Sequence, residues 1–70
     1  MTYIDRNNYK ELDHILWDTR KKLIAPKDAF AFYERRWAHV DKNNLDKLEL
    51  VLIEDLTKLV GNGHFLPVAA

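Results

Sequence analysis

Cysteine and serine are both absent from this chain of 70 residues, and glycine and proline occur only twice each. Without cysteine there is no disulfide and no thiolate to bind a metal ion. Without serine or cysteine, the usual nucleophiles of hydrolases are missing as well. The scarcity of glycine and proline leaves long stretches free of helix breakers. These absences favour a helical domain and argue against an enzyme.

The chain also lacks an excess of charge and any long apolar run. Eleven basic and eleven acidic residues give a formal net charge of zero, which argues against a protein that acts mainly by coating phosphates. No segment approaches the roughly 20 apolar residues of a membrane span, and the N-terminus has no signal-peptide pattern. We therefore expect a soluble cytoplasmic protein, folded as a single helical domain over residues 1–70, with no contact to a membrane.

Helix signals divide the chain into three segments. The sequence predicts an all-α, three-helix domain with helices over residues 8–22, 26–40 and 44–60 and an extended apolar C-terminal tail from residue 64. Asn8 followed by Glu11 resembles a capping box, so the first helix is expected to begin there. Pro26 suits the first turn of the second helix, because that position needs no backbone N–H.

The third helix has its own start and stop signals. Asn43 or Asn44 can cap its first turn, and Gly61 can take the left-handed conformation that ends a helix. Its leucines span a wide arc, which is typical of a helix that is central or shared with a partner.

Projection of each segment at about 100° per residue separates a core stripe from a few exceptions. The predicted core comprises Tyr9, Leu12, Leu16, Phe30, Tyr33, Trp37, Leu45, Leu48, Leu52, Leu56 and Leu59. Trp17, Phe32 and Leu50 fall outside these stripes. Either the chain termini cover these three side chains, or the side chains contact a partner.

A small domain has a marginal core, so binding to a partner or to itself is a plausible reinforcement. The sequence therefore favours a non-enzymatic protein-interaction or regulatory module such as an antitoxin, inhibitor, adaptor or small subunit. We expect the contacts to come from Trp17, Phe32, Arg35, Arg36 and Leu50, because exposed aromatic and arginine side chains dominate protein interfaces. If the protein binds a second copy of itself, we expect Leu50 and Val51 to form the contact.

Nucleic-acid binding is the alternative. Arg20, Lys21, Lys22 and Lys27 could form a basic patch at the junction of the first two helices. The same cations could simply complement the dipole at the end of the first helix. The balanced charge and the acidic residues of the third helix make this alternative weaker.

Few residues suggest catalysis or a metal site. His14 and Asp18 lie four apart, and His39 or His64 would have to supply a third ligand, which is too little for a convincing site. The carboxylates Glu34, Glu49, Glu54 and Asp55 are expected at ordinary surface positions. We expect no catalytic residues, no metal and no cofactor.

Overall fold

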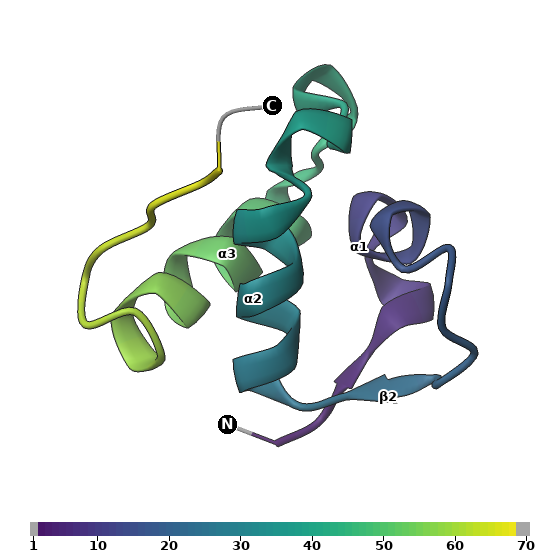
Figure 1. Ribbon diagram of the computed structural model, residues 1–70, viewed down its shortest axis with the longest axis horizontal. Helices are drawn as coiled ribbons and strands as arrows, with labels where there is room; N and C mark the ends of the chain where they lie inside the picture. The colour runs from purple at the N-terminus through teal and green to yellow at the C-terminus, as the bar shows by residue number, and fades with distance from the viewer. Residues whose placement is uncertain (1, 69–70) are drawn as a thin grey trace.

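The computed structural model describes residues 2–68 as three α-helices and a short two-stranded sheet (Figure 1). The elements are β1 (Ile4–Asp5), α1 (Lys10–Ile15), β2 (Leu23–Ile24), α2 (Pro26–Arg35) and α3 (Lys47–Leu59), with single-turn 3-10 helices at Arg6–Asn8, Trp37–His39 and Lys42–Asn44. The expectation of a small three-helix domain is confirmed. The sheet was not expected, and the last two residues of the predicted tail, 69 and 70, lie outside the described part of the chain.

The first helix is much shorter than predicted. It begins at Lys10 with Tyr9 at the N-cap position and no side-chain cap, so the predicted capping box at Asn8 is wrong. It ends at Ile15, and the chain then turns and runs as a loop to β2 instead of continuing to residue 22. No glycine or proline marks this end. The stop comes from tertiary contacts that are described below.

The two residues that directly follow the predicted first helix form β2. Ile4 lies opposite Ile24, and Asp5 lies opposite Leu23, in an antiparallel pair. Ile4 and Ile24 are buried. Because side chains alternate between the two faces of a strand, this register places Leu23 on the outer face, where it is exposed.

The second helix begins at Pro26 as predicted but ends at Arg35, not at residue 40. The following 3-10 turn changes the direction of the chain, so that Val40 is buried and the N–H of Asp41 donates to Oε1 of Glu11 at 2.8 Å. A continued α-helix would carry these residues along the axis of α2. The contact with Glu11 therefore requires the helix to end.

Asp46, not Asn43 or Asn44, caps the third helix. Its Oδ1 accepts from the backbone N–H of Glu49 at 2.9 Å. The helix ends near the predicted position, but the prediction that Gly61 takes the left-handed conformation is wrong. The positive φ angles belong to Asn62 and Gly63 instead, and the N–H of Gly63 donates to the C=O of Thr57 at 2.8 Å.

The core lies between the sheet and the three helices. Its buried hydrophobic members are Ile4, Leu12, Ile15, Leu16, Ile24, Ala29, Phe30, Tyr33, Val40, Leu52 and Leu56. The prediction of a core position is wrong for two residues: Leu48 is 55% exposed and Leu59 is 63% exposed. Both lie at one edge of the wide leucine arc of α3. The core covers the other side of this arc and leaves that edge exposed.

The segment after α3 runs back along α2 (Figure 1). The ring of Phe65 packs edge-on against Phe30 and Trp37, with centroid separations of 5.9 and 5.0 Å. The N–H groups of Leu66 and Val68 donate to the side chain and the backbone carbonyl of Glu34, each at 2.8 Å. The segment thus covers the core stripe of α2.

Among residues 2–68, no helix has the length and apolar character needed to cross a membrane.

Candidate functional site

Charged side chains are used inside the fold, and the most buried of them is Glu49. Contrary to the prediction of a surface position, Glu49 has no exposed area. Its Oε1 and Oε2 accept from the backbone N–H groups of Glu11 (3.1 Å) and Leu12 (2.9 Å), and Oε2 also accepts from the Tyr33 hydroxyl at 2.6 Å. A residue of α3 therefore caps the first turn of α1, whose N–H groups have no partner within the helix.

The same network involves Tyr33 at the centre of α2. Burial raises the pKa of the Tyr33 hydroxyl far above its ordinary value, and the hydrogen bond to Glu49 and the charge of that carboxylate raise it further. Tyr33 therefore stays a neutral donor. Within residues 2–68, no buried side-chain oxygen or nitrogen lacks a hydrogen-bond partner.

Glu11 links α1 to the segment before α3. Its carboxylate accepts from the N–H of Asp41 at 2.8 Å and from Nδ2 of Asn44 at 2.9 Å. Burial disfavours the charged form, but these hydrogen bonds and the nearby His14 outweigh it, so the pKa of Glu11 lies below its ordinary value of 4.5. Glu11 is thus a structural residue and not the helix cap that its spacing from Asn8 suggested.

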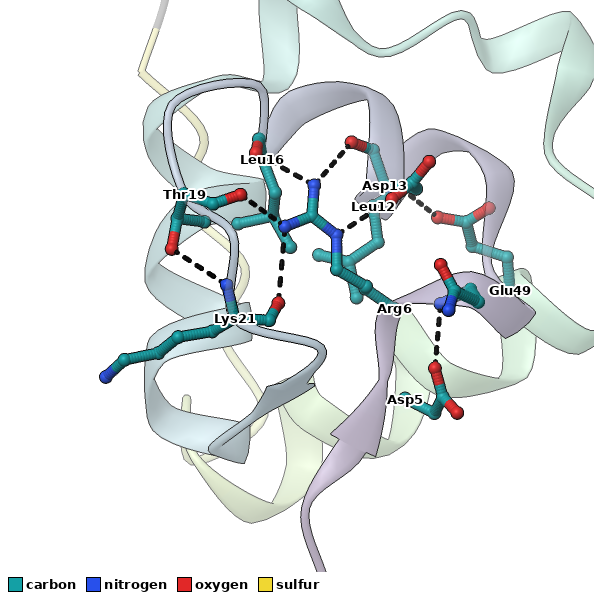
Figure 2. Close-up of polar contacts among 9 residues, drawn as sticks. Asp5, Arg6, Leu12, Asp13, Leu16, Thr19, Lys21 and Glu49 are labelled. Atoms are coloured by element: carbon teal, nitrogen blue, oxygen red, sulfur yellow. Dashed lines mark hydrogen bonds and ion pairs between the residues drawn. The ribbon is translucent and has the colours of Figure 1, made fainter.

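Arg6 holds the other end of α1. Figure 2 shows its guanidinium facing the turn after the helix, where Nη2 donates to the carbonyls of Asp13 (3.1 Å) and Leu16 (2.8 Å). Nη1 donates to the carbonyls of Thr19 (2.6 Å) and Lys21 (3.2 Å), and Nε forms an ion pair with Asp13 Oδ1 at 2.8 Å. Because the Arg6 guanidinium donates to these carbonyls, they do not need the N–H groups of a further helical turn. This explains why α1 ends early.

Four of the five predicted partner-binding residues lie together on the side of α2 that faces away from its buried stripe. The Arg36 guanidinium lies over the ring of Trp17 at 4.2 Å and over the ring of Phe32 at 4.8 Å, measured from Cζ to the centroids. Arg35 lies 5.6 Å from the Phe32 centroid. We call Trp17, Phe32, Arg35 and Arg36 the aromatic–arginine surface. Within residues 2–68, Trp17 is 59% exposed.

Arg36 is fixed in this position by two hydrogen bonds to Asp18. Nη1 and Nη2 donate to Oδ1 and Oδ2 at 2.9 and 2.7 Å, and Nη1 also donates to the C=O of Ile15 at 2.7 Å. The hydrogen bond to Arg36 lowers the pKa of Asp18, and the bond to Asp18 raises the pKa of Arg36. The charge of Arg36 is therefore engaged within the protein, and the residue supports Trp17.

Arg35 differs from Arg36 in that its charge is available. It is exposed, and within the part of the chain that the structure describes it forms no ion pair. Phe32, between the two arginines, is half-buried. Leu50 does not join this surface: it is exposed on α3, beside Val51.

The residues predicted for nucleic-acid binding are exposed, but not at a helix end. Arg20, Lys21 and Lys22 lie in the loop between α1 and β2, so the expected interaction with the dipole of the first helix is wrong. Lys22 pairs with Asp5 at 3.6 Å. Lys27 lies in the first turn of α2 and is exposed.

A groove adjoins the aromatic–arginine surface. It encloses about 510 Å³, and its walls are formed by Tyr3, Thr19, Lys21, Leu23, Ile24, Ala25, Asp28 and Phe32. Phe32 belongs to both features. A smaller hollow of about 420 Å³, lined by Thr2, Tyr3, Ala25 and Pro26, shares two residues with the first. We call the two together the sheet groove.

Sequence reasoning missed the groove because it predicted no strand between the first two helices, where β2 lies. One signal was present: the residue before a proline favours an extended backbone, so Ala25 before Pro26 indicated a strand-like approach to α2. The pairing of that stretch with residues 4 and 5 had no local signal.

The histidines do not gather into a metal site. Since α1 ends at Ile15, His14 and Asp18 are not one helical turn apart, and Asp18 binds Arg36. His39 instead packs edge-on against Trp17 at 5.3 Å. Among residues 2–68, no three His, Asp or Glu side chains lie close enough to hold a metal ion.

The fold and these sites define the class of protein as a small helical domain with a minor two-stranded sheet. No protein-family model, no curated protein and no solved structure matches this chain.

Proposed function

We propose that this protein is a small non-enzymatic interaction module that binds another protein through the aromatic–arginine surface. The observation that carries the proposal is the state of Trp17, which is more than half exposed and yet held against Arg36. Exposed tryptophan and arginine are the residues that most often dominate the binding energy of protein interfaces.

The contacts of Trp17 within the protein support the proposal. Asp18 and the C=O of Ile15 fix Arg36, and Arg36 in turn supports the indole ring from one side. A side chain that is already ordered loses less conformational entropy when it is buried in a complex. A purely incidental surface tryptophan would need no such support.

The test is affinity capture from the native host's lysate, with and without nuclease. The variants are Trp17→Ala and Leu48→Ala, since Leu48 is similarly exposed at 55% but lies on α3. Trp17 is a better choice than the half-buried Phe32, because truncating Phe32 also removes packing against the core. We expect a stoichiometric protein that survives nuclease, is lost with Trp17→Ala and is retained with Leu48→Ala.

Two results would contradict the proposal. Recovery of nuclease-sensitive material alone would favour the nucleic-acid alternative, which is supported by the exposure of Arg20, Lys21 and Lys27. That binding should weaken steeply as salt rises, unlike an aromatic interface. Equal loss of a protein partner with both variants would mean that the aromatic–arginine surface is not the contact.

A second copy of the chain is the remaining candidate partner. Leu48, Val51 and Leu59 are exposed along one side of α3, and Leu50 is exposed about 100° around the helix from Val51. Sedimentation of the wild type and Val51→Asp over a range of concentrations tests it: a dimer lost with the variant supports self-association.

A further inference from the structure

The sheet groove continues from the aromatic–arginine surface and has a chemical character of its own. Its apolar walls are Tyr3, Leu23, Ala25 and Phe32, of which Tyr3 is 65% and Leu23 is 53% exposed. A hollow of about 510 Å³ is within the range of sites that hold a few side chains of a ligand. The surface therefore offers a place for an apolar side chain.

The shape of the groove favours an extended occupant. Its two hollows have Tyr3 and Ala25 in both of their walls and therefore adjoin each other. A compact ligand would fill one hollow only, whereas a peptide in an extended conformation can cross both.

The backbone beside the groove is also suited to an extended chain. The N–H of Arg6 donates to the C=O of Lys22 at 3.0 Å, in register with the Ile4–Ile24 pair. Hydrogen-bonded and non-hydrogen-bonded pairs alternate along two antiparallel strands, and Leu23 belongs to a non-hydrogen-bonded pair, so its N–H and C=O point away from β1. Among residues 2–68 these two groups have no hydrogen-bond partner, and they lie at the open edge of β2, as in proteins that bind a peptide by adding a strand.

The charges around the groove are mainly positive. Lys21 is part of the wall, Arg35 lies against Phe32 with no ion pair among the described residues, and Arg20 is exposed next to Lys21. Asp28 is the one acidic residue in the wall of the larger hollow. Cations at the rim of an apolar groove attract a ligand that carries negative charge around an apolar anchor.

We propose that the sheet groove binds an extended acidic segment of a partner protein, which inserts an apolar side chain between Leu23 and Phe32 and places its carboxylates against Lys21 and Arg35. This inference rests on the proposed function and specifies the chemistry of the partner. A nucleic acid would meet the same cations, but the apolar walls favour a peptide.

The experiment uses a phage-displayed library of random dodecapeptides selected against the full chain. We expect the enriched peptides to be acidic and to share a large apolar residue. Resynthesised peptides should shift the backbone amide resonances of Leu23, Ala25 and Phe32 in two-dimensional NMR spectra. Peptides that are neutral or basic, peptides that map to α3, or no enrichment at all would overturn the inference.

Matched variants separate the contributions of charge and apolar contact. The double variant Lys21→Glu with Arg35→Glu should weaken the enriched peptides about tenfold or more, whereas Lys47→Glu, an exposed lysine of α3, should leave them unchanged. Leu23→Asp should abolish binding, and Leu48→Asp, at similar exposure, should not. Asp28→Asn should strengthen binding. Equal effects of a variant and its control would contradict the assignment of the groove.

This test can fail independently of the proposed function. If no peptide is enriched but the lysate partner is still lost with Trp17→Ala, the interaction module remains and the acidic-segment inference is wrong. A fluorescein-labelled poly(dT) oligonucleotide provides the other comparison. If it binds and displaces every enriched peptide in a salt-sensitive manner, the cations serve a phosphate backbone, and the inference is overturned.

Discussion

Around α1 the charged side chains of Arg6, Glu11 and Glu49 bind backbone groups of the fold, whereas on the outer side of α2 the aromatic rings of Trp17 and Phe32 lie at or near the surface. In the first region, polar groups act as structural supports. In the second, large apolar groups remain partly uncovered. The comparison teaches that residue type alone does not separate structural from binding residues, and it predicts opposite responses to substitution.

The strongest way to break the first region is to remove Glu49. Glu49→Ala leaves the buried Tyr33 hydroxyl and two N–H groups of α1 without their acceptor. We expect the free energy of unfolding to fall by about 3 to 5 kcal/mol, because each buried group without a partner costs about 1–3 kcal/mol. Urea denaturation followed by circular dichroism measures it. Glu54→Ala, an exposed glutamate of the same helix, should change stability by less than about 0.5 kcal/mol.

We expect Arg6 to make the next largest contribution to the free energy of unfolding. Arg6→Ala removes the donors to the carbonyls of Asp13, Leu16 and Thr19, and we expect a loss of about 2 to 3 kcal/mol, less than for Glu49 because water can reach part of this site. Hydrogen exchange should show the loop over residues 16–22 opening first. Arg6→Lys should not restore stability, since an ammonium group cannot span these separate carbonyls. Stability equal to that of Arg20→Ala would show that Arg6 does not end α1.

The pH dependence of stability sharpens the description of Glu11. Its pKa in the folded protein lies below the ordinary value of 4.5, so its stabilising effect is present above about pH 4.5 and is lost as the pH falls through the folded pKa. Glu11→Gln should therefore be less stable than the wild type at neutral pH. The difference should shrink below about pH 4.5 in urea denaturation series. A difference that stays constant with pH would show that the carboxylate charge is not the cause.

The smallest effect on stability is expected in the second region. Trp17→Ala removes a largely exposed ring and one stacking contact with Arg36, so we expect a loss of about 1 kcal/mol or less. Thermal denaturation checks this value. A loss as large as that of Arg6→Ala would mean that Trp17 is a structural residue, and the contrast between the two regions would disappear.

Part of this order could be read from the sequence. Glu49 lies three residues before Leu52 and seven before Leu56, within the apolar arc of α3, whereas Glu54 projects to the opposite side of the helix. The pattern Asp46 to Glu49 did signal a helix start, since an aspartate followed three residues later by a glutamate is typical of one. That the glutamate caps a different helix depends on how α1 and α3 pack.

The aromatic–arginine surface was more accessible to sequence reasoning. Phe32 falls outside the apolar stripe of α2, and a helical projection alone separates it from Phe30 and Tyr33. Trp17 is exposed as expected, but the projection assumed a helix there, and α1 ends at Ile15. Leu48 and Leu59 were misplaced because their arc on α3 is continuous with that of Leu52 and Leu56. Periodicity gives the width of an apolar face, but the packing partners decide how much of it is covered.

What the sequence by itself determined is the helical class, the start of α2 at Pro26 and the end of α3 before the Gly61–Gly63 turn, because proline and a residue with positive φ such as Gly63 act through their own backbone geometry. Only the tertiary structure decided that α1 ends at Ile15, that Leu23 and Ile24 form a strand and that Glu49 caps α1. Each of these depends on a hydrogen-bond partner that is distant in the chain: Arg6 for the loop, Ile4 and Arg6 for the strand, and the amides of α1 for Glu49. Local patterns carry no information about such partners, because the energy of these bonds arises only when the distant segments meet.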